Sequence, residues 1–466
     1  MPFLTESLIL LGALAIFFVT LGKGRTREAR VIALVTSAAT VLAAAVTLGQ
    51  EATLFDGAYR VDLFSQILKL AFAIGFVLVL LMKGKLPDIQ GEIKPEYYFF
   101  LTASVSGLMM LVSSIDVITL VVALELSAFP LYVMVAMRRE REGQRTQMES
   151  AIKYIMFGIA ANGIMLFGLS YLFGLTGTTS LRDLMPRLQP FLGSPVALVG
   201  LAMTFCGLYY KLAVFPFHFW TPDVYQGSSN ETAGLIASLP KIGAVAVLVR
   251  FVSLASPGDP TLSLFMAVLA GASMFYGNLV ALMQNDLKRL LGFSGIAHAG
   301  YALLGFVAMD RDGYTAAIYY IFAYALMVIA CFVAICRVSR DGTNVAMEEL
   351  AGLHRRSPML AVTLGVGIFA LAGIPPFAGF TAKLALLKAA LNQGHLALVV
   401  IAVVNTVIAI YYYLAVVRET FFRDPADRPA VVIDFPTRAL CVALVGGILA
   451  LGILPQPIIE AIKSSL

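Results

Sequence analysis

The stretch KLAVFPFHFW (residues 211–220) places a lysine, two prolines and a histidine where the surrounding sequence is apolar enough to cross a membrane. Proline inside a spanning helix removes a backbone hydrogen bond, and a lysine at mid-bilayer costs roughly 2.5–3.5 kcal/mol on insertion scales. Such a helix is tolerated where its opened backbone and its charge face protein or water. The stretch therefore predicts a broken membrane helix whose lysine, Lys211, lies inside a helical bundle.

The composition of the whole chain is typical of a membrane protein. Its 466 residues are 59% hydrophobic and 13% charged, with a mean hydropathy of +0.87, whereas about a quarter of the residues in soluble domains are charged. The four cysteines lie in apolar runs without the spacing of metal ligands, so we expect free thiols. The first apolar run has no basic residue before it, which favours a first membrane helix over a cleaved signal peptide.

Apolar runs of about 20 residues, the length that crosses the hydrocarbon core of a bilayer, recur throughout the chain. They predict an all-α polytopic membrane protein with about 14 transmembrane helices. The run at 358–391 is long enough to be one broken span or two. The expected spans cover residues 3–21, 30–49, 62–82, 96–113, 115–137, 149–173, 193–214, 231–252, 261–283, 286–308, 313–336, 358–391, 395–417 and 436–458.

Basic residues are distributed unequally between the loops. Most of those outside the spans lie in loops that follow odd-numbered spans, such as GKGRTREAR (22–30) and RREREGQRTQ (138–147). Because lysine and arginine mark the cytoplasmic side, we expect both termini on the non-cytoplasmic side. The segments LFDGAYRVD (54–62) and SLRDLMPRLQP (180–190) are expected to be short interfacial turns or helices.

Once the loops are set aside, among them NDLKR (285–289), six lysines remain within the expected spans, and one acid, Glu125, lies near the middle of the fifth span. A charge persists there only if it faces a bundle interior or water. Lys69 and Lys388 are expected to extend to an interface. For Lys153, near the start of its span, extension to the surface and a functional role are equally compatible with its position. A functional role is expected for the remaining groups, which are Glu125, Lys211, Lys241 and Lys383.

His298, in SGIAHAG (294–300), is expected to be functional rather than only a packing residue. One acid, several amines and an imidazole offer little chemistry besides proton transfer, since the spans contain no Ser/His/Asp set and no metal cluster. Moving a carboxylate away from a buried amine changes whether the amine holds its proton. These groups therefore predict a proton relay through the membrane.

A second broken helix is expected at LAGIPPFAGFTAK (371–383), where Pro375 and Pro376 precede Lys383. The loop charges make this helix antiparallel to the one that contains Lys211, five spans earlier. Broken helices in opposite orientations are typical of inverted repeats in ion-coupled transporters. Pro130 is expected to loosen the span of Glu125 in a similar way. The predicted units are N-terminal helices 1–3 (1–95), two inverted five-helix repeats (96–252 and 253–418) and a C-terminal helix 14 (419–466).

Four motifs together resemble the antiporter-like subunits of the proton-pumping NADH:quinone oxidoreductase, respiratory complex I. The WTPDVY-x-G form resembles subunit N rather than subunits L or M, and the resemblance covers nearly the whole chain. One departure is QGSSNET after DVY, where the family has an acidic, proline-containing continuation. The motifs are YKLAVFPFHFWTPDVYQGS (210–228), LPKIGAVAVLVRF (239–251), QNDLKRLLGFSGIAHAGYALLG (284–305) and LAGIPPFAGFTAKLALL (371–387).

The resemblance implies a role for each candidate residue. Glu125 matches a glutamate that pairs with a lysine, and Lys211 matches the lysine before the first break. Lys241 and His298 match residues that connect two half-channels. Lys153 matches a lysine at the start of span six, and Lys383 matches the lysine at the exit side of the relay. His218 and Trp220 are expected to have packing roles.

The resemblance also implies that this chain binds no cofactor of its own, and that NADH, FMN, iron–sulfur clusters and quinone belong to partner subunits. The expected partners are other membrane-arm subunits, among them a second antiporter-like subunit and small membrane subunits, together with the lipid bilayer; no nucleic acid is expected. The expected location is the bacterial inner membrane. Two alternatives remain open: a subunit of a multi-subunit cation/proton antiporter or membrane-bound hydrogenase, and a structural membrane subunit without a proton route.

Overall fold

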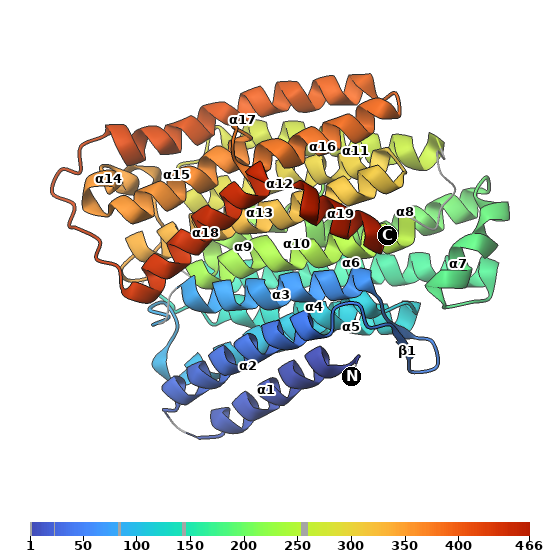
Figure 1. Cartoon of the computed structure of the whole chain (residues 1–466), viewed down its shortest axis with the longest axis horizontal. Helices are drawn as coiled ribbons and strands as arrows, with labels where there is room; N and C mark the ends of the chain where they lie inside the picture. Colours follow the sequence, from blue (N-terminus) through green and yellow to red (C-terminus); the bar gives the residue numbers. More distant parts are fainter. Residues whose placement is uncertain (1, 23, 83–84, 142–145, 253–259) are drawn as a thin grey trace.

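The computed structural model describes residues 2–22, 24–82, 85–141, 146–252 and 260–466, which fold almost entirely into helices (Figure 1). Long helices lie roughly side by side. In the view of Figure 1 the N-terminal α1 lies along one edge and α17 along the opposite edge. The C-terminal α18 and α19 return across the middle of the bundle.

The long helices coincide with the predicted spans, apart from shifts of a few residues at their ends. The run 358–391 consists of two helices in line. The bounds are α1 (Leu4–Thr20), α2 (Thr26–Val46), α3 (Leu63–Met82), α4 (Lys94–Ser113), α5 (Val117–Ala136), α6 (Thr146–Thr176), α8 (Pro195–Leu212), α10 (Asn230–Val252), α11 (Pro260–Ala281), α12 (Leu287–Val307), α13 (Arg311–Val338), α15 (Pro358–Ala372), α16 (Ala378–Asn392), α17 (Leu396–Phe422) and α18 (Phe435–Ile453).

Shorter elements connect them. The segment 180–190 contains a short helix, and LFDGAYRVD forms the turn and second strand of an antiparallel hairpin; their interfacial position stays a prediction. These elements are β1 (Ala52–Leu54), β2 (Tyr59–Val61), α7 (Leu181–Leu188), α9 (Trp220–Gly227), α14 (Leu353–Arg356), α19 (Gln456–Ser465) and the 3₁₀ turns at Gly91–Ile93, Gln189–Phe191 and Met347–Leu350.

Eleven helices in the described part of the chain are long and apolar enough to cross a membrane, and α1 and α15 are shorter apolar helices. The chain is therefore an all-α, multi-pass membrane protein, as predicted. The apolar stretch of α12 is wholly buried and that of α10 is 94% buried, whereas that of α17 is only 33% buried. Residues on α10 and α12 are consequently shielded from lipid on every side.

Both predicted helix breaks are present. Helix α8 ends at Leu212, Ala213 adopts a left-handed conformation (φ 66°), and α9 begins only at Trp220, so Pro216 lies inside the gap. Helix α15 ends at Ala372 and is capped by Gly373 (φ 85°), a position where glycine carries no Cβ penalty. Helix α16 begins at Ala378, beyond Pro375 and Pro376.

Two other prolines do not break their helices. Pro130 lies inside a continuous α5 and Pro240 inside a continuous α10, so the expected opening of the fifth span is limited to the lost hydrogen bond. The division into inverted repeats stays a prediction. Its boundaries fall in the first turn of α4, at the end of α10 and in the last turns of α17.

Candidate functional site

Lys211 lies in the last turn of α8, directly before the first break, and its side chain is buried. Its Nζ donates hydrogen bonds to the Leu124 carbonyl oxygen (3.0 Å) and to Ser127 Oγ (2.7 Å), on either side of Glu125 in α5. The half-buried Glu125 carboxylate accepts a hydrogen bond from Asn162 of α6. In the described structure Lys211 therefore contacts the residues around Glu125 but forms no direct ion pair with the Glu125 carboxylate.

Lys241 lies at the centre of the bundle, on α10, with 1% of its surface exposed. Its Nζ donates to the Gly295 carbonyl oxygen of α12 (3.0 Å) and to the Tyr324 hydroxyl of α13 (3.4 Å). The amine also lies 5.1 Å from the centre of the Tyr324 ring, a cation–π distance. His298 is one helical turn after Gly295, so the carbonyl that holds Lys241 and the ring of His298 lie on the same face of α12.

His298 is held by two tyrosine hydroxyls. Its Nδ1 is 2.5 Å from the Tyr320 hydroxyl and its Nε2 is 3.0 Å from the Tyr413 hydroxyl of α17. Tyr324 lies against the ring, with 4.9 Å between the ring centres. An imidazole with a hydroxyl on each nitrogen can accept a proton on one side and release one on the other. The sequence prediction of a functional His298 is compatible with this geometry.

Lys383 lies in α16, two turns beyond the second break. Its Nζ donates to the carbonyl oxygens of Leu371 (3.0 Å) and Ala372 (3.1 Å), the last residues of α15. The last carbonyls of a helix have no hydrogen-bond partner within the helix, and the partial negative charge at the C-terminal end of the helix dipole favours a cation. The amine also lies 4.8 Å from the centre of the Tyr301 ring, and Tyr301 in turn lies beside His298, with 6.1 Å between ring centres.

The structure thus connects three of the candidate residues through aromatic side chains that the sequence analysis missed. A line of polar groups leads from Lys241 to His298 and on to Lys383. We call the four tyrosines along it the tyrosine bridge: Tyr301, Tyr320, Tyr324 and Tyr413. Their signal in the sequence was the spacing of Tyr320 and Tyr324, which places two hydroxyls on one face of α13.

Lys153 is not part of this line. Its side chain is 37% exposed and forms ion pairs with Glu149 (2.6 Å) and with Asp223 of α9 (2.7 Å). Asp223 also pairs with Arg289 of α12 (2.8 Å). The aspartate of the WTPDVY motif therefore joins α6, α9 and α12. We call the ion-paired set Glu149, Lys153, Asp223 and Arg289 the surface clasp; it lies apart from the enclosed line of Lys241, His298 and Lys383.

The prediction that Lys69 extends to an interface is wrong. Only 2% of its side chain is exposed, and its Nζ pairs with Glu6 of α1 at 2.5 Å. Glu6 escaped the sequence analysis because it lies at the very start of the first span. Lys388 is exposed, and its extension to a membrane interface stays a prediction. Lys288, expected in the loop NDLKR, is instead buried in the first turn of α12 and donates to the Ser228 carbonyl oxygen (2.7 Å).

His218 and Trp220 pack as expected. His218 is 1% exposed and lies among the rings of Phe215, Phe219 and Tyr276. Trp220 stacks on Tyr154, and its Nε1 donates to the Tyr210 carbonyl oxygen (3.1 Å). These contacts hold the start of α9 against α6 and α8. The four cysteines are free thiols.

Comparison with known proteins identifies the family. Residues 114–409 match the family described as "NADH:quinone oxidoreductase/Mrp antiporter, TM". The chain is 64% identical over 465 residues to NADH-quinone oxidoreductase subunit N 2 of Opitutus terrae, an alignment that covers 100% of this chain and 97% of that protein. The chain belongs to the subunit N family of NADH-quinone oxidoreductases. More distant subunit N relatives include that of Nitrosomonas europaea, 35% identical over 86% of this chain and 84% of that one.

Solved structures agree with this assignment. A chain of respiratory complex I from Thermus thermophilus superimposes with a TM-score of 0.85 and 29% identity, covering 99% of this chain and 100% of that one. A chain of the Mrp complex from Dietzia has a TM-score of 0.87 but 22% identity over 100% of this chain and 96% of its own, which shows the shared fold alone. The subunit N family therefore shares its architecture with Mrp antiporters.

Proposed function

We propose that this chain moves protons across the membrane as the N-type subunit of a NADH-quinone oxidoreductase and performs no redox step itself. The observation that carries the proposal is the buried line of contacts from Lys241 through Tyr324, His298 and Tyr301 to Lys383. Hydrogen bonds hold Lys241 and His298, and ring contacts make the remaining links. Membership of the subunit N family supports the assignment to this complex, and the contacts among the buried residues support the proton route.

The route consists of proton transfers in which every donor regains a proton. Lys241 Nζ gives a proton to the Tyr324 hydroxyl, which releases its own proton to water beside His298. His298 takes a proton at one nitrogen from a tyrosine hydroxyl, which regains a proton from that water, and releases one from its other nitrogen, so the ring returns to its neutral form. Because the Tyr301 ring cannot carry a proton, water beside this ring passes the released proton to Lys383 Nζ. The carbonyl partners of Lys383 at the end of α15 stabilise the resulting cation.

Electrostatics set the scale of the driving force. Moving one charge against 100 mV costs about 2.3 kcal/mol, comparable to a change of about two pKa units in a carrier at about 1.4 kcal/mol per unit. The half-buried Glu125 carboxylate, next to the two groups that hold Lys211 Nζ, can supply a change of this size by moving toward or away from the amine.

The remaining expectations form part of the same proposal. NADH, FMN, iron–sulfur clusters and quinone belong to partner subunits, among them a second antiporter-like subunit and small membrane subunits. The chain resides in a bacterial inner membrane with both termini on the non-cytoplasmic side. The names of the relatives and the distribution of basic loop residues support these points.

One purification tests the assignment against its nearest rivals. A tagged chain isolated in mild detergent is expected to bring NADH dehydrogenase and quinone reductase activities with it. Hydrogenase activity, or the absence of any redox partner, would instead indicate the membrane-bound hydrogenase or the cation/proton antiporter.

Substitutions test the proton route against a purely structural role. Glu125→Gln and Lys211→Ala are expected to lower the number of protons moved per quinone reduced in complexes that still assemble. A structural subunit predicts fewer assembled complexes with an unchanged ratio.

A further inference from the structure

A cluster of three polar side chains lies outside the relay, among the N-terminal helices. Glu6 of α1 is 0% exposed, Lys69 of α3 is 2% exposed and Tyr59 of β2 is 5% exposed. We call this set the N-terminal polar cluster. It contains the same residue types as the relay, yet α1, β2 and α3 contribute none of the relay residues.

One carboxylate oxygen of the cluster is available to bind a proton. Glu6 Oε1 forms an ion pair with Lys69 Nζ and accepts a hydrogen bond from the Tyr59 hydroxyl, each at 2.5 Å. Glu6 Oε2 is buried and has no hydrogen-bond partner among the residues that the structure describes. Leaving such an oxygen unpaired costs about 1–3 kcal/mol, and an apolar trio of similar size would join the helices without that cost. Helix packing alone therefore does not explain why these three polar residues are buried together.

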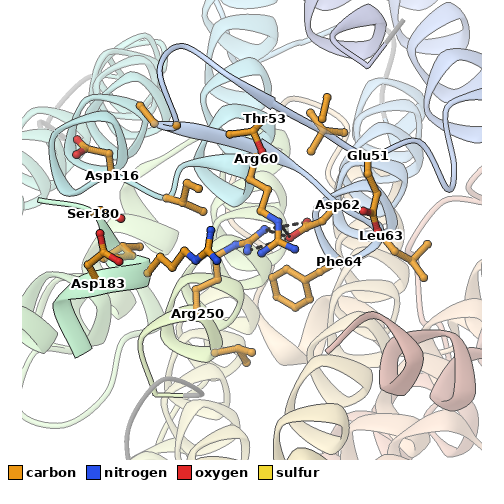
Figure 2. A pocket seen from close by; sticks show the side chains of 18 of the residues that line it. Glu51, Thr53, Arg60, Asp62, Leu63, Phe64, Asp116, Ser180, Asp183 and Arg250 are labelled. Carbon is orange, nitrogen blue, oxygen red and sulfur yellow. Dashed lines mark hydrogen bonds and ion pairs between the residues drawn. The ribbon is translucent and has the colours of Figure 1, made fainter. Parts of the chain in front are cut away.

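An open hollow lies beside the hairpin that contains Tyr59. Its volume is about 1310 Å³, and its walls include the hairpin, the start of α7 and the C-terminal residues 464–466. Figure 2 shows Arg60 and Arg250 converging on Asp62 at the floor of the hollow, where Arg250 binds both carboxylate oxygens at 3.0 and 3.2 Å. Charged groups of both signs thus face water here, including Glu51, Asp116 and Asp183.

Strand β2 contributes to both features: Tyr59 belongs to the cluster, and its neighbours Ala58 and Arg60 line the hollow, which none of the three cluster residues lines. Side chains alternate along β2, so Tyr59 is buried toward Glu6 whereas Arg60 is exposed toward the hollow. Asp62 and Lys69 are seven residues apart at the start of α3, which corresponds to about 10 Å along the helix. The charged groups near Glu6 are thus Lys69 and, toward the hollow, Asp62 and Arg250.

We propose that the N-terminal polar cluster is a second protonatable centre, which exchanges protons with the water of the hollow during turnover. Glu6 Oε2 accepts a proton from hydronium, which leaves a water molecule and a neutral carboxyl beside the Lys69 ammonium. The reverse step returns the proton to water and restores the ion pair. The centre goes beyond the proposed relay, since none of the relay residues takes part.

Infrared difference spectroscopy of the purified whole complex, with and without NADH and quinone, tests the exchange. Turnover is expected to produce a protonated-carboxyl band that shifts in D₂O and disappears in Glu6→Gln, a substitution that keeps the size of the side chain. The exposed Glu92→Gln is the matched control and should keep the band. Lys383→Ala should also keep it, which separates this centre from the relay.

Proton pumping supplies the second readout. Glu6→Gln and Lys69→Met are expected to lower pumping at least threefold per assembled complex, whereas the exposed Lys388→Met leaves it unchanged. If Glu6→Gln does not assemble, Tyr59→Phe must shift the carboxyl band, because it removes one hydrogen bond to Glu6. The proposal is overturned if the Glu6 band is missing, if Tyr59→Phe leaves it unshifted, or if the apolar pair Glu6→Leu with Lys69→Leu pumps at the wild-type rate.

Discussion

Gly452, near the end of α18, offers a direct way to displace the second helix break without touching a charged residue. A Cβ atom at this position would lie 2.0 Å from the Pro376 carbonyl oxygen and 2.7 Å from the Phe377 carbonyl carbon. Both are backbone atoms, so no side-chain rotation can relieve the overlap. Helix α18 therefore packs directly against the backbone of residues 376–378, between α15 and α16.

The size of the effect of Gly452→Ala follows from these distances. An ordinary contact begins near 3.4 Å, so the two backbones must separate by about 1.4 Å. Overpacking of this kind costs about 1–3 kcal/mol. Lys383 Nζ holds its two carbonyl partners at 3.0 and 3.1 Å, and a shift of half that size would take them beyond hydrogen-bond range. If about 1.4 kcal/mol of this cost falls on the proton-carrying state, pumping falls about tenfold.

The assay uses purified complex in proteoliposomes, with proton transfer and quinone reduction recorded together. Gly446→Ala, on the same helix and with no atom within 4 Å of the new methyl group, is the matched control and should pump normally. Equal pumping in Gly452→Ala and Gly446→Ala, at equal amounts of assembled complex, would refute the view that the position of the break controls Lys383.

Two further predictions concern the tyrosine bridge and the surface clasp. Removing the two hydroxyls that hold His298, in Tyr320→Phe with Tyr413→Phe, should lower pumping about tenfold or more, whereas the exposed Tyr411→Phe should not; unchanged pumping in the double variant would contradict a route through His298. Asp223→Asn should weaken the junction of α6, α9 and α12 by about 1–2 kcal/mol, seen as a lower unfolding temperature of the complex, while protons per quinone stay constant; a changed ratio would move Asp223 and Lys153 into the relay.

Sequence reasoning located the helices and both breaks because each depends on a local signal. Span length is dictated by the bilayer, and proline disrupts a helix wherever the rest of the chain lies. The same reasoning singled out Lys211, Lys241, His298 and Lys383, since a charge or imidazole inside an apolar run is visible without a structure.

Partners of these residues could not be predicted in the same way. The tyrosine bridge joins α12, α13, α16 and α17. The spacing of Tyr320 and Tyr324 places both on one face of α13, but nothing local shows which residues they contact. The Glu6–Lys69 pair joins helices 63 residues apart, so the burial of Lys69 depends on tertiary packing alone. Lys288 was expected in a loop because QNDLKR is polar. In the structure Asp286 caps α12, so Lys288 is already the second residue of that helix and is buried.

The central claim is that protons pass through the enclosed line that ends at Lys383. The most direct test is the number of protons moved per quinone reduced in complexes that carry Lys383→Ala, compared with Lys388→Ala five residues later on the same helix. The account predicts a lower ratio for Lys383→Ala and a wild-type ratio for the exposed Lys388→Ala. The same ratio in both, with normal assembly, would contradict it.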